Sequence, residues 1–216
     1  MKVAVIVFPG SNCEFDAARA LSSLGAEPEL VWHRDTEIFE FDGVLLPGGF
    51  AHGDYLRTGA IARFSPAMAS VTEMAFDGTP VLGICNGFQI LCEAGLLPGA
   101  LIANRGLKFI CRTVELEVVD TNSILTRSCR VGDRLQIPLN SYEGNYVDPK
   151  GTGRVVVRYV DNPNGSQNDA AAIANAEGNV VGIMPHPERA SESILGSTDG
   201  LRLLEGFVAS MEVARV

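Results

Sequence analysis

Short, continuously apolar runs alternate with helix-like segments along the first half of the chain. Residues 2–8, 43–46 and 80–84 have the length of strands, and turn residues follow each of them. Residues 14–24 and 60–75 place apolar side chains at helical spacing. Continuous apolar runs are typical of strands buried on both faces. Their alternation with helices therefore predicts βαβ units around a parallel sheet.

Local turn chemistry supports these boundaries. We expect the first helix to be capped by Ser11 or Asn12 and to end at Gly25, and a strand to follow over residues 29–32. The strand at residues 43–46 runs into a Pro-Gly-Gly turn.

The second half of the chain has a different pattern. "FICRTVELEVVD" and "GRVVVRYVD" alternate apolar and polar residues, as half-buried antiparallel strands do. "AAIANAEGNVVGIMP" is typical of a hairpin that turns at Glu177-Gly178-Asn179. "STDGLRLLEGFVASMEVA" predicts a closing helix capped by Ser197 or Thr198. We expect one α/β domain over residues 1–216 with an antiparallel extension.

Charge and cysteine content exclude several classes of protein. The 26 acidic and 17 basic residues give a net charge of −9, and the basic residues form no cluster, so nucleic acid is not an expected partner. The longest apolar runs are far shorter than the roughly 18 residues of a membrane span. The apolar N-terminus lacks a cleavage motif and is interpreted as a strand. Five cysteines without a CxxC pair indicate free thiols and a cytoplasmic location.

Cys85 lies where a buried strand is expected to end and a helix to begin. "GICNG" matches the Gly-x-nucleophile-x-Gly elbow, in which the central side chain projects from a sharp turn into a cleft. A helix N-terminus beneath the sulfur favours the thiolate, which is the attacking form. The alternative is a packed structural thiol, which is the interpretation we favour for Cys92 on the following helix.

A thiol nucleophile needs a base, and the chain has three histidines. His186 directly follows the apolar strand at residues 180–184. Glu188 comes two residues later, where the extended Pro187 directs its carboxylate toward the same side. His33 and His52 are less favoured as the base, although Asp54 lies near His52. A proline-flanked surface histidine is the alternative for His186.

Acyl transfer also needs donors for an oxyanion. The backbone N–H of Asn86 is available at the elbow. Gly49 in "LPGGF" ends another expected strand and can turn its own N–H into the cleft. Gly-Gly pairs usually mark simple turns, so this second donor is the weaker inference.

The combination of "PGGF", "GICNGFQIL" and "PHPE" resembles the class I, or triad, glutamine amidotransferases. Further segments, among them "FPGSNCEFD", "LPGGFAHGDYLRTGAIA", "KFICRTVEL", "NPNGS" and "GSTDGLRLLEGF", resemble the glutaminase subunits of phosphoribosylformylglycinamidine synthase over nearly the whole chain. The resemblance implies a flavodoxin-like, open, mostly parallel sheet with helices on both faces.

The resemblance to these amidotransferases also implies a reaction and roles for individual residues. Cys85 would attack the side-chain amide of L-glutamine, His186 would be the base and Glu188 its orienting partner, with Gly49 and Asn86 as the oxyanion hole. Ammonia would pass to a large ATP-dependent synthetase subunit, with a small accessory subunit in the complex. No metal or cofactor is expected in this chain. The chain has no Gly-x4-Gly-Lys-Ser/Thr loop, so ATP and magnesium are expected on the partner.

Substrate contacts are harder to infer. Gln89, Phe50 and Phe88 flank the elbow and the Gly-Gly turn, and they are candidates for shaping the glutamine pocket.

One segment departs from the family pattern. Where Ala-His-Gly is common, this chain has Asn140-Ser141-Tyr142. The change either alters coupling to the synthetase or is a tolerated replacement in a surface loop.

Two other functions remain open at this point. A free-standing cysteine hydrolase on a similar fold would share the elbow, but Glu188 and "PGGF" suit an amidotransferase better. A non-catalytic regulatory module is disfavoured because Cys85, His186 and Glu188 are all present.

Overall fold

A nine-stranded sheet forms the centre of the molecule, which the computed structural model describes over residues 1–213. The strand order is β2-β1-β3-β4-β11-β10-β9-β6-β7. The strands are β1 (Lys2–Val7), β2 (Glu27–Trp32), β3 (Gly43–Leu46), β4 (Val81–Ile84), β6 (Ile110–Val118), β7 (Arg134–Ser141), β9 (Arg154–Tyr159), β10 (Ala170–Ala174) and β11 (Val180–Ile183).

The first five strands in this order are parallel to one another. With β11 as the fifth parallel strand, the order is the 2-1-3-4-5 arrangement of flavodoxin-like sheets, which confirms the expected fold class. All residues of β3, β4 and β11 are buried, as their continuous apolar runs predicted.

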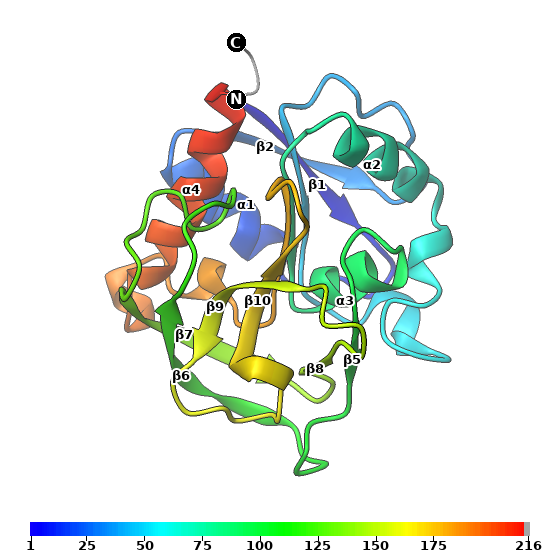
Figure 1. Cartoon of the computed structure of the whole chain (residues 1–216). Helices are drawn as coiled ribbons and strands as arrows, with labels where there is room; N and C mark the ends of the chain where they lie inside the picture. The colour runs from blue at the N-terminus through cyan, green and yellow to red at the C-terminus, as the bar shows by residue number, and fades with distance from the viewer. Residues whose placement is uncertain (214–216) are drawn as a thin grey trace.

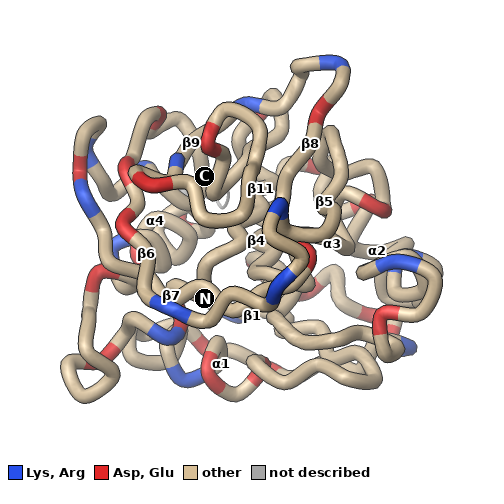
Figure 2. The backbone as a smooth tube through the Cα atoms, turned by 90° about the horizontal axis from the view of Figure 1, so that it is seen from below, with Lys and Arg blue, Asp and Glu red and all other residues tan. Residues whose placement is uncertain are grey.

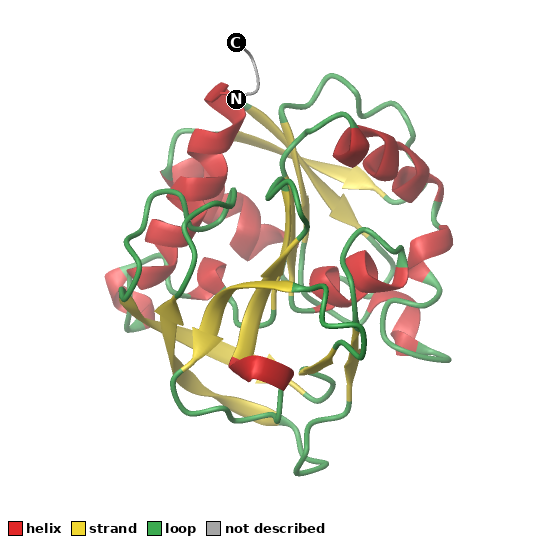
Figure 3. Cartoon of the chain, in the orientation of Figure 1, coloured by secondary structure: helices red, strands yellow, loops and turns green. Residues whose placement is uncertain are grey.

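The antiparallel extension is also confirmed. β10 pairs with β11 and β9, and β6 pairs with β9 and β7, all antiparallel. In Figure 3 these strands form the lower part of the sheet. Buried and exposed residues alternate along β7. A separate two-stranded sheet of β5 (Ala100–Ile102) and β8 (Asn145–Val147) was not predicted, because three-residue strands carry too little periodicity.

Helices cover both faces of the sheet. Figure 1 shows α1 and α4 together on one side and α2 and α3 on the other. The α-helices are α1 (Glu14–Ser23), α2 (Pro66–Phe76), α3 (Asn86–Glu93) and α4 (Asp199–Val213). Residues 1–213 also contain five short 3₁₀ turns: η1 (Ala51–Asp54), η2 (Ala62–Phe64), η3 (Gln167–Asp169), η4 (Pro187–Arg189) and η5 (Ser193–Leu195).

Two helix boundaries differ from the sequence-based expectation. The single helix expected over residues 60–75 is interrupted at Ser65, whose backbone is extended (ψ 141°) because Pro66 follows it. Cys13, and not Ser11 or Asn12, occupies the N-cap position of α1, without a side-chain capping bond. Gly25 follows the C-cap with a φ of 80°, as expected for a helix stop.

The closing helix and the surface agree with expectation where they are described. Ser197 Oγ accepts a hydrogen bond from the Asp199 N–H at 3.1 Å, and Ala214, expected at the end of the helix, lies outside the described residues. In Figure 2 Lys and Arg segments are interspersed with Asp and Glu segments. Within residues 1–213, none of the helices has the length and apolar character that a membrane span requires.

Candidate active site

Three adjacent parallel strands deliver the segments singled out in the sequence to one cavity. Gly49 follows β3, Cys85 follows β4 and His186 follows β11. The carboxyl ends of these strands meet there, where open α/β sheets place their ligands. The cavity has a volume of about 510 Å³, within the range of small-molecule sites. Its lining residues are Asn12, Cys13, Gly49, Phe50, Gly53, Asp54, Thr58, Cys85, Gln89, Phe109, Asn140, Ser141, Tyr142, Glu143, His186 and Arg189.

Cys85 has the strained backbone of a nucleophile elbow. Its φ of 51° and ψ of −102° are unusual for a non-glycine residue, and its N–H donates to Ile183 O at 2.7 Å. The flanking glycines act through close packing. A Cβ on Gly83 would lie 2.6 Å from Gly87 C, and a Cβ on Gly87 would lie 2.0 Å from Leu46 O. The turn therefore requires both glycines while Cys85 carries the strain.

The thiol of Cys85 is partly accessible from the cavity. The residue is 8% exposed, and its Sγ donates to the backbone oxygen of Asn140 at 3.6 Å. Cys92, on the same helix, donates to Pro98 O at 3.8 Å, and burial raises the pKa of its thiol. Cys92 therefore has the properties of a packed thiol, whereas Cys85 faces the cavity.

His186 and Glu188 form a buried pair. His186 Nδ1 donates to Glu188 Oε1 at 2.6 Å, and each residue is 2% exposed. His186 Nε2 is buried and has no hydrogen-bond partner. Burial lowers the pKa of His186, but the charge of Glu188 and, next, that of Cys85 outweigh it and hold this pKa well above its usual value. The imidazole is thus oriented through Nδ1, leaving Nε2 free to exchange a proton.

Gly49 lines the cavity, and Asn86 directly follows Cys85. Asn86 is the first residue of α3, where helical N–H groups lack intrahelical acceptors. Gly49 faces Ser11 in an isolated bridge and has a φ of 150°; a Cβ there would lie 2.7 Å from Gly10 O. Only glycine fits this approach of the two chain segments.

The cavity also contains Cys13 and Arg189, which sequence reasoning missed. Cys13 Sγ lies 4.0 Å from His186 Nδ1 and accepts from Arg189 Nη2 at 3.2 Å. Cys13, His186 and Glu188 offer ligand atoms within 4.8 Å of one another, a spacing that their hydrogen bonds explain. The only sequence signal for Cys13 was its position after the first strand.

The expected substrate contacts divide into two groups. Gln89 and Phe50 line the cavity, as proposed. Phe88 does not: it is 1% exposed, its ring stacks on Tyr146 at 5.9 Å, and it fills the space above Gly182. Its place on α3 turns it toward the sheet, so Phe88 is a packing residue and not a pocket residue.

The other two histidines lie in an aromatic cluster. The rings of His33 and His52 are 5.2 Å apart, and His33 Nδ1 lies 2.9 Å from Ser65 Oγ. Burial, followed by the charges of His52 and Arg34, lowers the pKa of His33. Neither histidine lines the cavity.

The segment Asn140-Ser141-Tyr142, which differs from the family pattern, forms one wall of the cavity. Ser141 is buried at the end of β7, and its Oγ has no partner. Tyr142 is exposed, so a tolerated replacement in a surface loop can explain the residue at this position only. Asn140 contacts Cys85 through its backbone, so this contact does not depend on the side chain at position 140.

Known proteins give an independent comparison. The family model of the CobB/CobQ-like glutamine amidotransferase domain matches residues 1–199. The phosphoribosylformylglycinamidine synthase subunit PurQ of Rubrobacter xylanophilus is 51% identical over 220 aligned residues, covering 99% of this chain and all of the relative. A chain in the structure of PurLQS from Thermotoga maritima is 41% identical with a TM-score of 0.93, covering 96% of this chain and 97% of that one.

A more distant structure shares the fold. It is a glutamine amidotransferase of Thermotoga maritima, 19% identical with a TM-score of 0.62, covering 100% of this chain and 93% of that one. The chain therefore belongs to the CobB/CobQ-like glutamine amidotransferase family, among the relatives of PurQ.

Proposed function

We propose that this protein is the glutaminase subunit of phosphoribosylformylglycinamidine synthase, which hydrolyses L-glutamine and passes ammonia to a synthetase subunit. The observation that carries the proposal is the juxtaposition, at two neighbouring strand ends, of a strained Cys85 with the buried His186–Glu188 pair. The similarity to PurQ supports the choice of glutamine and of the synthase.

The first half of the reaction forms a thioester. His186 Nε2 takes the thiol proton of Cys85, and Sγ attacks the side-chain amide carbon. The N–H groups of Gly49 and Asn86 hold the resulting oxyanion. Collapse of the intermediate breaks the C–N bond, and His186 returns the proton to the leaving nitrogen, which departs as ammonia.

The second half regenerates the enzyme. His186 deprotonates a water, which attacks the glutamyl thioester through a second oxyanion. The C–S bond breaks and the thiolate is protonated, so glutamate leaves. Throughout the cycle, Glu188 stabilises the imidazolium and fixes the ring orientation.

The synthetase partner completes the proposed complex. ATP and magnesium belong on that large subunit, which uses the ammonia to form the amidine, and a small accessory subunit joins them. The similarity to a chain of PurLQS supports this assembly. The chain's lack of a Gly-x4-Gly-Lys-Ser/Thr loop agrees with an ATP site elsewhere.

We place the synthetase over the mouth of the cavity, because ammonia has to cross directly from one subunit to the other. Large apolar side chains are exposed on the segments beside the mouth. These residues, termed here the apolar rim, are Phe50, Tyr55, Leu56, Leu107, Phe109 and Tyr142. An exposed apolar patch of this kind is typical of an interface.

Residues 1–216 are proposed to act as one catalytic domain in the cytoplasm. β1 and β11, from opposite ends of the chain, lie in one sheet, which supports a single domain. All five cysteines lie within the described residues and are free thiols, as is common in a reducing compartment.

Ammonia release by the purified chain, with and without the synthetase and in the presence of the ribonucleotide and ATP, tests the function. Cys85→Ala is expected to lower glutamine hydrolysis at least about a thousandfold, because no nucleophile remains. A diazoketone analogue of glutamine should label the wild-type protein and leave Cys85→Ala unlabelled.

Cys129→Ala is the matched control, since Cys129 is a buried thiol outside the cavity. It should retain labelling and activity. Glutaminase activity in Cys85→Ala would remove the proposed mechanism. Full activity without the synthetase would favour a free-standing hydrolase, and inactivity under every condition would favour a regulatory module.

A further inference from the structure

One wall of the cavity carries two carboxylates that the proposed mechanism does not use. Asp54 ends η1, and Glu143 lies in the turn after β7. Asn86 Nδ2 donates to Asp54 Oδ1 at 3.3 Å and to Gln89 Oε1 at 2.9 Å. Gln89 Nε2 in turn donates to the backbone oxygen of Glu143 at 2.6 Å. These hydrogen bonds connect the acidic wall to α3, the helix that follows Cys85.

The negative charge of this wall has no cation to balance it. Among residues 1–213, no lysine or arginine lies within ion-pair distance of Asp54 or Glu143. Arg57 is engaged by both carboxylate oxygens of Glu93. Burial, followed by the charge of Glu143, raises the pKa of Asp54 to about 6.

Two buried polar atoms in the same cavity have no hydrogen-bond partner within the described part of the protein. Thr58 is 8% exposed, lines the cavity, and its Oγ1 has no hydrogen-bond partner. Glu143 Oε2 is likewise shielded from solvent without a partner. A buried polar group left unpaired costs about 1–3 kcal/mol, so such groups in a native site need an explanation.

The backbone around Asp54 is held in an unusual conformation. His52, Gly53, Asp54 and Leu56 have φ values of 54°, 72°, 55° and 71°. The side-chain oxygen of Asn86 anchors this segment by accepting from Ala51 N–H at 3.0 Å. Strain of this kind is retained where a side chain has to be held in place.

We propose that Asp54 and Glu143 form the subsite for the α-ammonium group of the amino-acid substrate, with Thr58 Oγ1 as a further acceptor. An ammonium group has three donors and no acceptor, and it supplies the positive charge that this wall lacks. The inference rests on the proposed function, since it assigns one end of glutamine while the amide lies at Cys85. The subsite selects a free α-amino acid over an analogue without the amino group.

The test compares two substrates in the complex with the synthetase. L-glutamine carries the ammonium group; 4-carbamoylbutanoate has the same amide and carboxylate without it. Asp54→Asn and Glu143→Gln should each lower kcat/KM for glutamine about 10- to 100-fold, mainly through KM, the range for a lost charged hydrogen bond. The value for 4-carbamoylbutanoate should change less than about threefold. Glutamine binding to the Cys85→Ala protein, measured by calorimetry, should weaken in the same way.

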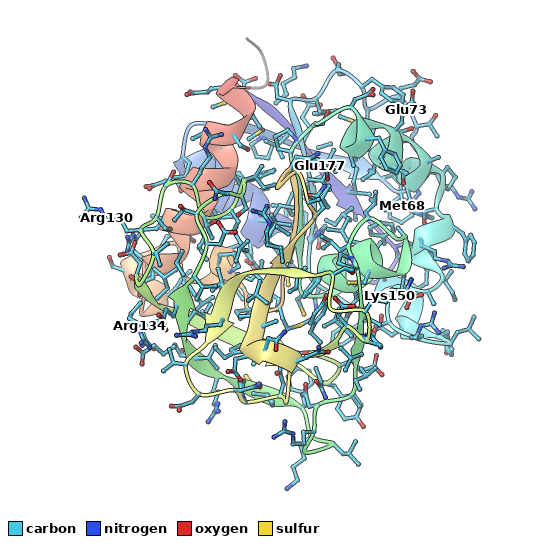
Figure 4. The ribbon with its side chains drawn as sticks, in the orientation of Figure 1. Met68, Glu73, Arg130, Arg134, Lys150 and Glu177 are labelled. Atoms are coloured by element: carbon cyan, nitrogen blue, oxygen red, sulfur yellow. The ribbon has the colours of Figure 1, made fainter. Side chains whose placement is uncertain are left out.

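Glu73→Gln and Asp77→Asn are the matched controls. Both residues are exposed, Glu73 on α2 and Asp77 at its C-cap, and Figure 4 shows Glu73 at the periphery of the molecule. Their kinetic constants should remain those of the wild type. Equal losses on the two substrates in Asp54→Asn and Glu143→Gln would overturn the subsite alone. Failure of the wild-type complex to hydrolyse glutamine would instead overturn the proposed function.

Discussion

At the scale of single residues, the ammonium subsite has a thermodynamic consequence. The pKa of Asp54 in the folded protein, about 6, lies above its ordinary value of 3.8 because of burial and the charge of Glu143. Between these two pH values the folded protein holds a proton that the unfolded chain has lost. The free energy of unfolding therefore falls as pH rises through this window. This loss of stability reaches its full size above about pH 6.

Asp54→Asn should stabilise the free protein above that window, because the amide removes the buried charge. We expect the free energy of unfolding to rise by about 1–2 kcal/mol at pH 7.5, after allowing for solvent screening of a partly exposed group. Near pH 4 the difference should largely disappear. Urea unfolding at both pH values measures this, with Asp77→Asn as the control. A gain of equal size at both pH values would show that the carboxylate charge is not its cause.

At the scale of elements, the β4–α3 elbow depends on how closely α3 approaches β3. Gly87, in the first turn of α3, lies directly against the backbone oxygen of Leu46 in β3. Backbone cannot move aside as a side chain can, so a methyl group at position 87 has to displace the helix. The position of the helix determines where the Asn86 N–H lies and in which direction the Cys85 side chain points.

Gly87→Ala should therefore affect stability and activity together. We expect a loss of at least about 2 kcal/mol in the free energy of unfolding, the range for overpacking. Glutamine turnover should also fall, because the elbow shifts. Gly106→Ala is the control: a Cβ there meets nothing within 4 Å, and its stability should change by less than about 0.5 kcal/mol. If both variants unfold alike, the close approach to Leu46 is not limiting.

Elements with an unbroken apolar pattern or a local motif could be predicted from the sequence. β3 and β4 appear as continuous apolar runs, and the elbow at Cys85 is encoded by five adjacent residues. The break at Ser65 was missed because the apolar spacing of residues 60–75 continues across Pro66. The spacing of apolar residues predicts which side chains are buried, but it does not reveal where the backbone of a helix is interrupted.

The site could be predicted only in part for a related reason. His186 and Glu188 are only two residues apart along the chain, so their pairing could be expected, and the structure brings Nδ1 and Oε1 to 2.6 Å. The roles of the triad stay a prediction until the variants are measured. Asp54 and Glu143 could not be paired beforehand, because 89 positions separate them and only the fold brings them to one cavity.

At the scale of the whole molecule, the active cavity opens beside the apolar rim. Leu56 is 93% exposed and Leu107 is 69% exposed, in segments that come from different parts of the chain. Side chains of this size are rarely left in water as a group unless a partner covers them. The apolar rim and the transfer of ammonia from the cavity therefore both favour docking of the synthetase on this face.

Leu56→Glu combined with Leu107→Glu should weaken assembly with the synthetase without unfolding the chain. A charge on each side chain has to be desolvated on docking, so the dissociation constant should rise at least about tenfold, which is 1.4 kcal/mol. Stimulation of glutaminase activity by the synthetase should require correspondingly more partner. Phe76→Glu is the matched control, because Phe76 is 82% exposed at the end of α2 and does not belong to the rim. Sedimentation of the mixed subunits measures assembly. Equal weakening by Phe76→Glu, or unchanged assembly in the double variant, would place the synthetase on another face.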